Sequence, residues 1–139
     1  MPDGTDPTSP DAATGSTGVG PDAQQSVCEQ ATLHSDLAFI QDNVFSATCA
    51  RSTCHTSTNQ AGGLVLEQGM ARDYLVGKAS TQHAGWTRVV PGQPDMSYLF
   101  VAIGGADGPD RGTMPWAMPM LCQEKIDAIR RWIAAGANP

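Results

Sequence analysis

The chain has 139 residues, enough for one small domain, and 40% of them are hydrophobic but only 6% aromatic. With 15 Gly and 10 Pro, a core built from side chains alone would be small and rich in loops. The net charge of −6 and the lack of any basic stripe argue against a nucleic-acid partner, which needs a phosphate-neutralising surface, and no stretch approaches the ~20 apolar residues that span a bilayer.

Residues 1–27 are mostly Gly, Pro, Ser, Thr, Ala and Asp, so we expect a disordered, solvated tether before a folded domain at residues 28–139. The tether holds four aspartates and no Lys or Arg, which leaves 10 of the 14 acidic residues and all 8 basic ones in a nearly balanced domain. It is either a plain flexible terminus or a spacer that holds the domain away from a membrane anchor or a partner. If the protein is exported, we expect its leader and any lipid anchor to have been removed.

The pattern becomes helical from Ser35, where Ser35 or Asp36 can cap a helix that runs to Cys49. Its apolar stripe consists of Leu37, Ile40, Val44 and Phe45. Residues 56–63 predict a loop in which glycines allow the backbone to approach a flat ligand closely. Met70, Tyr74 and Leu75 predict a short second helix, and residues 76–88 a second loop.

Residues 89–92 predict a turn, after which Pro94 is suited to the first position of a helix. The apolar side chains of that helix are Met96, Leu99 and Ile103, and Gly104-Gly105 ends it. Prolines and glycines make residues 106–120 an extended loop that carries three of the six methionines. The last helix has one apolar face, Arg130 and Arg131 on the other, and Gly136 at its end; the apolar face is Ile126, Ile129, Trp132 and Ile133.

Two thiols and an imidazole lie within seven residues at Cys49, Cys54 and His55. A cysteine pair whose second member adjoins a histidine is typical of covalent haem attachment, in which the sulfurs add to the vinyl groups and the histidine supplies one axial bond to iron. Four residues separate the cysteines here instead of the usual two. The other cysteines begin the folded region and the last helix, so a Cys28–Cys122 disulfide is expected if the first and last helices pack together.

Over about residues 40–137 the chain resembles the small class I c-type cytochrome domains of exported bacterial proteins, particularly the planctomycete and myxobacterial sort. The resemblance rests on five short pieces in the right order, none of them specific alone. They are Cys49 to His55, Gly62-Gly63-Leu64-Val65-Leu66, Val90-Pro91-Gly92-Gln93-Pro94 with Ser97-Tyr98-Leu99, Met114-Pro115, and Ile126 to Trp132-Ile133 with Ala135-Gly136-Ala137.

The resemblance implies an all-α, cytochrome c-like fold of three to four helices with long loops around one haem c, whose terminal helices cross. It makes Cys49 and Cys54 the thioether positions, His55 the proximal iron ligand and Met114 the distal one. Pro115 also favours an extended conformation at the residue before it, as such a ligand requires. The alternatives for the distal position are Met118, which also precedes a proline, then Met120, Met96 and His83; we expect His34 and His83 at the surface.

The implied function is one-electron transfer, not enzymatic catalysis, because a haem with both axial positions filled does not readily bind dioxygen or peroxide. A thioether ligand and an apolar pocket both favour ferrous iron, which predicts a higher potential than bis-histidine ligation gives. We expect a monomer with transient redox partner proteins, periplasmic or exported, with a membrane attachment only through an N-terminal lipid anchor.

Three other interpretations remain open. In the first, Cys49, Cys54 and His55 join Cys28, Cys122, His34 or His83 in a zinc-binding module without haem. In the second, a Cys49–Cys54 disulfide stabilises a structural or interaction domain. In the third, displacement of Met114 opens the iron for a haem enzyme or sensor.

Overall fold

The computed structural model describes residues 27–104, 114–115 and 118–139. This part of the chain is helical and contains no sheet, only isolated bridges that join Val76 to Val89 and Thr87 to both Ala79 and Ser97. The expected all-α class is therefore confirmed. Residues 1–26 of the expected tether and most of the expected loop at 106–120 lie outside the described residues, and Val27 already belongs to a helical stretch at 27–31. None of the described helices is long and apolar enough to cross a membrane.

The first long helix begins where the sequence predicts and leads directly into Cys49. Helix α2 (Leu37–Ile40) is capped by the carboxylate of Asp36, which accepts a hydrogen bond from the backbone N–H of Phe39 at 2.9 Å. It continues without a break as a π-helix, η2 (Gln41–Cys49), which the apolar spacing did not predict. The hydrogen bond from the Ala50 N–H to the Phe45 carbonyl, 2.7 Å long, shows the wider turn at its end.

The middle of the chain forms short helices joined by turns. The 3-10 turn η3 (Ala61–Gly63) follows the cysteine-histidine segment, and α3 (Ala71–Leu75) lies where a second helix was predicted. The single helix predicted after Pro94 is instead divided into η4 (Pro94–Met96) and α4 (Tyr98–Ala102). The break falls at Ser97, whose buried hydroxyl accepts from the Val90 N–H at 2.8 Å and donates to the Gln93 carbonyl at 2.9 Å.

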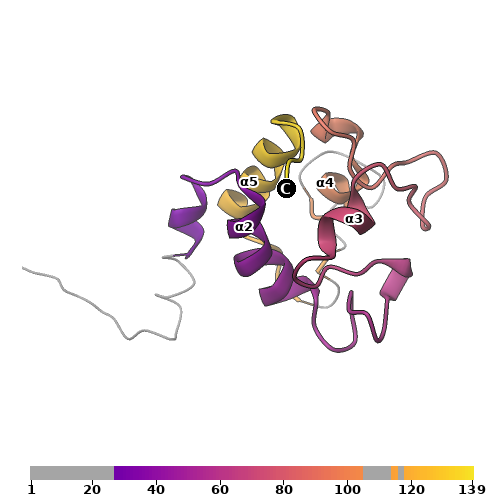
Figure 1. Cartoon of the computed structure of the whole chain (residues 1–139). Helices are drawn as coiled ribbons and strands as arrows, with labels where there is room; N and C mark the ends of the chain where they lie inside the picture. The colour runs from indigo at the N-terminus through magenta and orange to yellow at the C-terminus, as the bar shows by residue number, and fades with distance from the viewer. Residues whose placement is uncertain (1–26, 105–113, 116–117) are drawn as a thin grey trace, which may run out of the picture.

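Helix α5 (Gln123–Ala134) closes the fold by packing against α2 and η2 (Figure 1). Trp132 meets the ring of Phe45 edge-to-face, with centroids 6.5 Å apart, in the centre of the core. The apolar face predicted for this helix is buried as expected. Arg131 is an exception to the predicted polar face, because it is half-buried and donates hydrogen bonds to the Ala31 and His34 carbonyls, each 2.8 Å long.

A covalent link also joins the two ends of the described chain. Cys28 and Cys122 form the expected disulfide, with their Cα atoms 6.3 Å apart. This bond explains why a cysteine occupies the N-cap of α5, where its side chain makes no capping hydrogen bond. The disulfide and Arg131 together fix residues 27–36 to α5.

Candidate functional site

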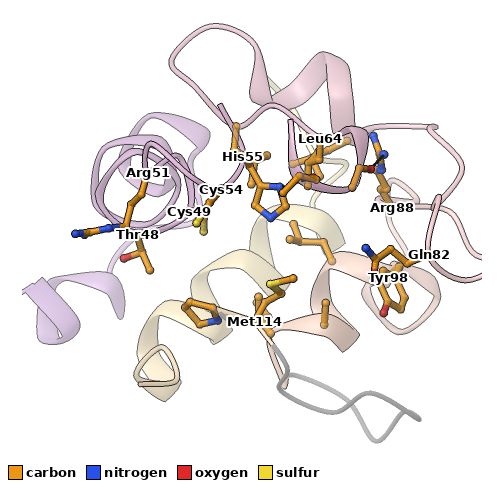
Figure 2. Close-up of a pocket in the computed structure, with 18 of the residues that line it drawn as sticks. Thr48, Cys49, Arg51, Cys54, His55, Leu64, Gln82, Arg88, Tyr98 and Met114 are labelled. Atoms are coloured by element: carbon orange, nitrogen blue, oxygen red, sulfur yellow. Dashed lines mark hydrogen bonds between the residues drawn. The ribbon is translucent and has the colours of Figure 1, made fainter. Parts of the chain in front are cut away.

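A cavity of about 690 Å³ opens between the cysteine-histidine segment, α4 and the methionine-bearing chain after it. Its volume falls within the ~300–1,000 Å³ of sites that enclose small molecules and cofactors. All four residues expected to hold the cofactor line it, from two parts of the sequence (Figure 2): Cys49, Cys54, His55 and Met114. Apolar side chains, among them Leu64, Leu66, Leu75, Leu99 and Ile103, form much of the remaining wall.

Cys49, at the end of η2, and Cys54, five residues later, are free thiols. Cys49 is the last residue of the π-helix, and its carbonyl accepts the His55 backbone N–H at 3.1 Å, which closes the intervening residues into a compact loop. Burial, and then the neighbouring Cys54, raise the pKa of the Cys49 thiol to about 12, whereas Lys125 acts in the opposite direction. Cys49 is therefore protonated and uncharged at neutral pH.

The His55 imidazole is held in one orientation. Its Nδ1 lies 2.9 Å from the Ala61 carbonyl, and since a carbonyl only accepts, Nδ1 carries the ring proton. This tautomer leaves Nε2 with a free lone pair, the usual arrangement of a metal-binding histidine. Burial lowers the pKa of His55, although the backbones of Ala61 and then Leu64 act in the opposite direction, so the ring is neutral and able to bind a metal at neutral pH.

Met114 lies across the cavity from His55 (Figure 2). Its backbone N–H donates to the Ala102 carbonyl at 3.0 Å, and its side chain packs against the main core. Met118 also lines the cavity but is 37% exposed, whereas Met96 and Met120 are more exposed and do not line it. A sulfur ligand opposite His55 can therefore come from Met114 or, with less support from packing, from Met118.

The other two histidines do not line the cavity, although His83 is next to residues that do. His34 forms a 2.7 Å contact with the Asp36 carboxylate and stacks on Phe39, and His83 packs against Tyr98 with ring centroids 4.9 Å apart. Both are half-buried, so the expectation that they lie at the surface holds only in part.

Two buried cations near the cavity were missed by the sequence interpretation. Arg88 lines the cavity and is 9% exposed, and its guanidinium donates to the carbonyls of Tyr74 and Gly62, each at 2.9 Å. Lys125, in the first turn of α5, is 6% exposed, and burial lowers its pKa. Within the described part of the chain, neither side chain forms an ion pair. Their charge gave no sequence signal, because a lone Arg or Lys is usually exposed.

The described lining of the cavity therefore carries positive charge, from Arg51 and Arg88, and no carboxylate, although the protein is acidic overall. Such a lining suits a ligand that is largely apolar and carries an acidic group at its edge.

Comparisons with the models of known protein families, with curated proteins and with solved structures found no match to this chain. The function is therefore inferred from the chemistry of the cavity and from the sequence resemblance.

The arrangement of the cysteines weighs against two of the alternatives. Cys28 and Cys122 are bonded to each other, and among the described residues the only cluster with metal-ligand spacing combines this pair with Glu124. Within that part of the chain, a zinc site built on Cys49, Cys54 and His55 thus has no fourth ligand gathered around it. The proposed Cys49–Cys54 disulfide is also absent from the described residues, where both thiols are free.

Proposed function

We propose that this protein is a one-electron carrier with a single covalently attached haem of the c type. The observation that carries the proposal is the convergence on one cavity of two free thiols, a neutral imidazole with its Nε2 free, and a thioether facing that imidazole. These are the four groups that a c-type site with His/Met ligation requires. The fold that this implies is cytochrome c-like.

The residues present fit such a cofactor. Cys49 and Cys54 would form the thioether bonds, His55 would bind iron through Nε2, and Met114 would bind it from the other side. The Arg88 guanidinium, which has no carboxylate partner among the described residues, would pair with an acidic group at the edge of the cofactor. When bound, the haem would supply reversible one-electron chemistry at its iron.

The protein's own residues would set how that chemistry proceeds. The Ala61 carbonyl holds the His55 proton on Nδ1 and so increases the electron donation of the imidazole. The leucines of the wall would present an apolar surface to the cofactor, and an apolar surrounding disfavours the more highly charged ferric state. Because both axial positions would be filled by side chains, we propose electron transfer to transient partner proteins and no enzymatic reaction.

An oxidising compartment is part of the proposal. The Cys28–Cys122 disulfide supports it, since such bonds persist in exported and periplasmic proteins and are rare in the cytosol. We therefore propose a periplasmic or exported carrier, which a lipid anchor before the folded domain could attach to a membrane.

The test is a set of absorption spectra on protein made in a host that matures c-type haem. Wild type should keep its haem through denaturing electrophoresis and give a six-coordinate spectrum in both oxidation states. Met114→Ala should lose the sulfur ligand, so that carbon monoxide binds the reduced protein, while Met118→Ala, the matched control, should match wild type.

A colourless wild-type protein from such a host would reject the proposal. If the two methionine variants exchange their behaviour, the distal ligand is Met118. Carbon monoxide binding to reduced wild type at neutral pH would instead favour a haem enzyme or sensor with an open site.

A further inference from the structure

The 3-10 turn η3 (Ala61–Gly63) holds the acceptor that orients the His55 imidazole. Local backbone hydrogen bonds form it, from the Gly63 N–H to the Gln60 carbonyl at 2.7 Å and from the Ala61 N–H to the Cys54 carbonyl at 3.1 Å, but its backbone conformation is costly. Three residues at this turn adopt positive φ angles, Gln60 at 48°, Gly62 at 66° and Gly63 at 70°. Glycine loses more conformational freedom than any other residue when it is ordered, and the non-glycine Gln60 is uncommon in this region. The turn is also largely exposed, so hydrogen bonds from other segments, and not burial, hold it against the core.

Arg88 makes those contacts. One terminal nitrogen of its guanidinium, Nη2, donates to the Gly62 carbonyl at 2.9 Å and approaches the Gly63 carbonyl at 3.4 Å. The other, Nη1, donates to the Tyr74 carbonyl of α3 at 2.9 Å. The planar guanidinium thus spans two segments and fixes the turn relative to a helix of the core.

The backbone of Arg88 is itself held on both sides. Its N–H donates to the Lys78 carbonyl at 2.7 Å, and its carbonyl accepts from the Leu99 N–H at 2.9 Å. The side chain therefore extends from a fixed point and is buried along its length. A weaker second support comes from the exposed Thr81, whose hydroxyl donates to the same Gly62 carbonyl at 2.7 Å.

We propose that Arg88 is the positioning residue of His55: by holding the Ala61–Gly63 turn against α3, it fixes the carbonyl that keeps the ring proton on Nδ1 and leaves Nε2 toward the cavity. The inference rests on the proposed function only for what Nε2 then binds. The hydrogen bonds themselves lie within the chain.

The chain offers a control for the loss of an arginine from the cavity wall. Arg51 also lines the cavity, but it is exposed, and its side chain makes no hydrogen bond or ion pair within the described residues. Replacing it removes a positive charge from the cavity wall without touching the turn. His34 is an internal reference, because its Nδ1 contacts Asp36 in a part of the chain fixed to α5.

The experiment measures the exchange rate and position of the ring proton of each histidine by NMR on nitrogen-labelled full-length protein in the reduced state. In wild type, His55 should be protonated at Nδ1 and exchange slowly. Arg88→Met should accelerate that exchange about tenfold or more, the effect expected on losing hydrogen bonds from a charged donor. Arg51→Met should leave it unchanged, and His34 should be unaffected in every variant.

Two further variants keep the test decisive if Arg88→Met does not fold. Arg88→Lys keeps the charge that acts on His55, but its single nitrogen replaces the two, Nη1 and Nη2, that bond the Tyr74 and Gly62 carbonyls, so exchange at His55 should still accelerate. Thr81→Val should give a smaller change in the same direction. If exchange in the folded Arg88 variants stays within about twofold of Arg51→Met, well below the change expected for a lost charged hydrogen bond, the positioning role is overturned.

The outcome is separable from that of the proposed function. Haem retention on denaturing electrophoresis decides whether a porphyrin is attached, and a negative result there rejects the electron carrier. The ring-proton measurement is interpreted in the same way on protein that purifies without porphyrin, because donor and acceptor both belong to the chain.

Discussion

Replacing both Cys28 and Cys122 with alanine should lower the free energy of unfolding by about 3–5 kcal/mol. The bond joins residues 94 positions apart, so it closes almost the whole folded domain into one loop. The loop-closure entropy for that separation corresponds to about 4.7 kcal/mol at 25 °C, and measured disulfides typically contribute about 2–4 kcal/mol. The expected loss runs from the upper half of the measured range to the loop-closure value.

The double variant should still fold, because the other contacts of the same region remain. Arg131 keeps its hydrogen bonds to the Ala31 and His34 carbonyls, and Ala31 and Phe39 keep their packing against Ala128. The loss should therefore appear as a lower urea midpoint in a single cooperative transition, followed by far-ultraviolet circular dichroism. Leu33→Ser, at a site 84% exposed in the same segment, is the control and should leave the midpoint unchanged.

A loss below about 1 kcal/mol in the double variant would refute this reasoning, because it falls short of the entropy of so long a loop. It would mean that residues 27–36 detach before the rest of the domain unfolds, so that the bond constrains only a local segment.

Counting reactive thiols under denaturing conditions tests the thioether bonds. Haem-loaded protein should show no reactive thiol before reduction of the disulfide and two after it. A chain without thioether bonds would show two before reduction and four after it. Asp36→Ala should cost about 1 kcal/mol in unfolding free energy at neutral pH through loss of the α2 cap. Hydrogen bonds from His34 and then from the Phe39 N–H lower the pKa of Asp36 below its usual 3.8. The stabilisation by the cap is therefore complete above pH 3.8 and is lost in more acidic solution. There the urea midpoints of wild type and Asp36→Ala should converge. Ile129→Ala, at a fully buried site in α5, should lower the unfolding free energy by about 2–5 kcal/mol. Arg130→Ala, on the exposed side of the same helix, should change it by no more than about 0.5 kcal/mol. Equal losses would show that α5 does not pack as described.

Local pattern was sufficient to predict several elements of this fold. The apolar spacing and caps predicted α2, α3 and α5, because the free energy of forming a helix depends largely on which face can be buried and how its ends are capped. The positions of Cys28 and Cys122, at the start of the folded region and of the last helix, predicted their bond on the condition that the first and last helices pack together.

Tertiary contacts decided the rest. The π-helical turns of η2 and the break between η4 and α4 depend on hydrogen bonds that no apolar spacing encodes, as at Ser97. The burial of Arg88 and Lys125 depends on carbonyls and side chains distant in the sequence, and charge alone predicts exposure.

The sequence by itself determined which groups are available for cofactor chemistry: two thiols beside a histidine, and methionines followed by prolines. Only the tertiary structure decided that Met114 faces His55 across one cavity, and that the carbonyl of Ala61 fixes the imidazole proton. The reason is physical. A side chain's chemistry is set by its own atoms, whereas its pKa, its tautomer and the group opposite it are set by neighbours that folding brings from elsewhere in the chain.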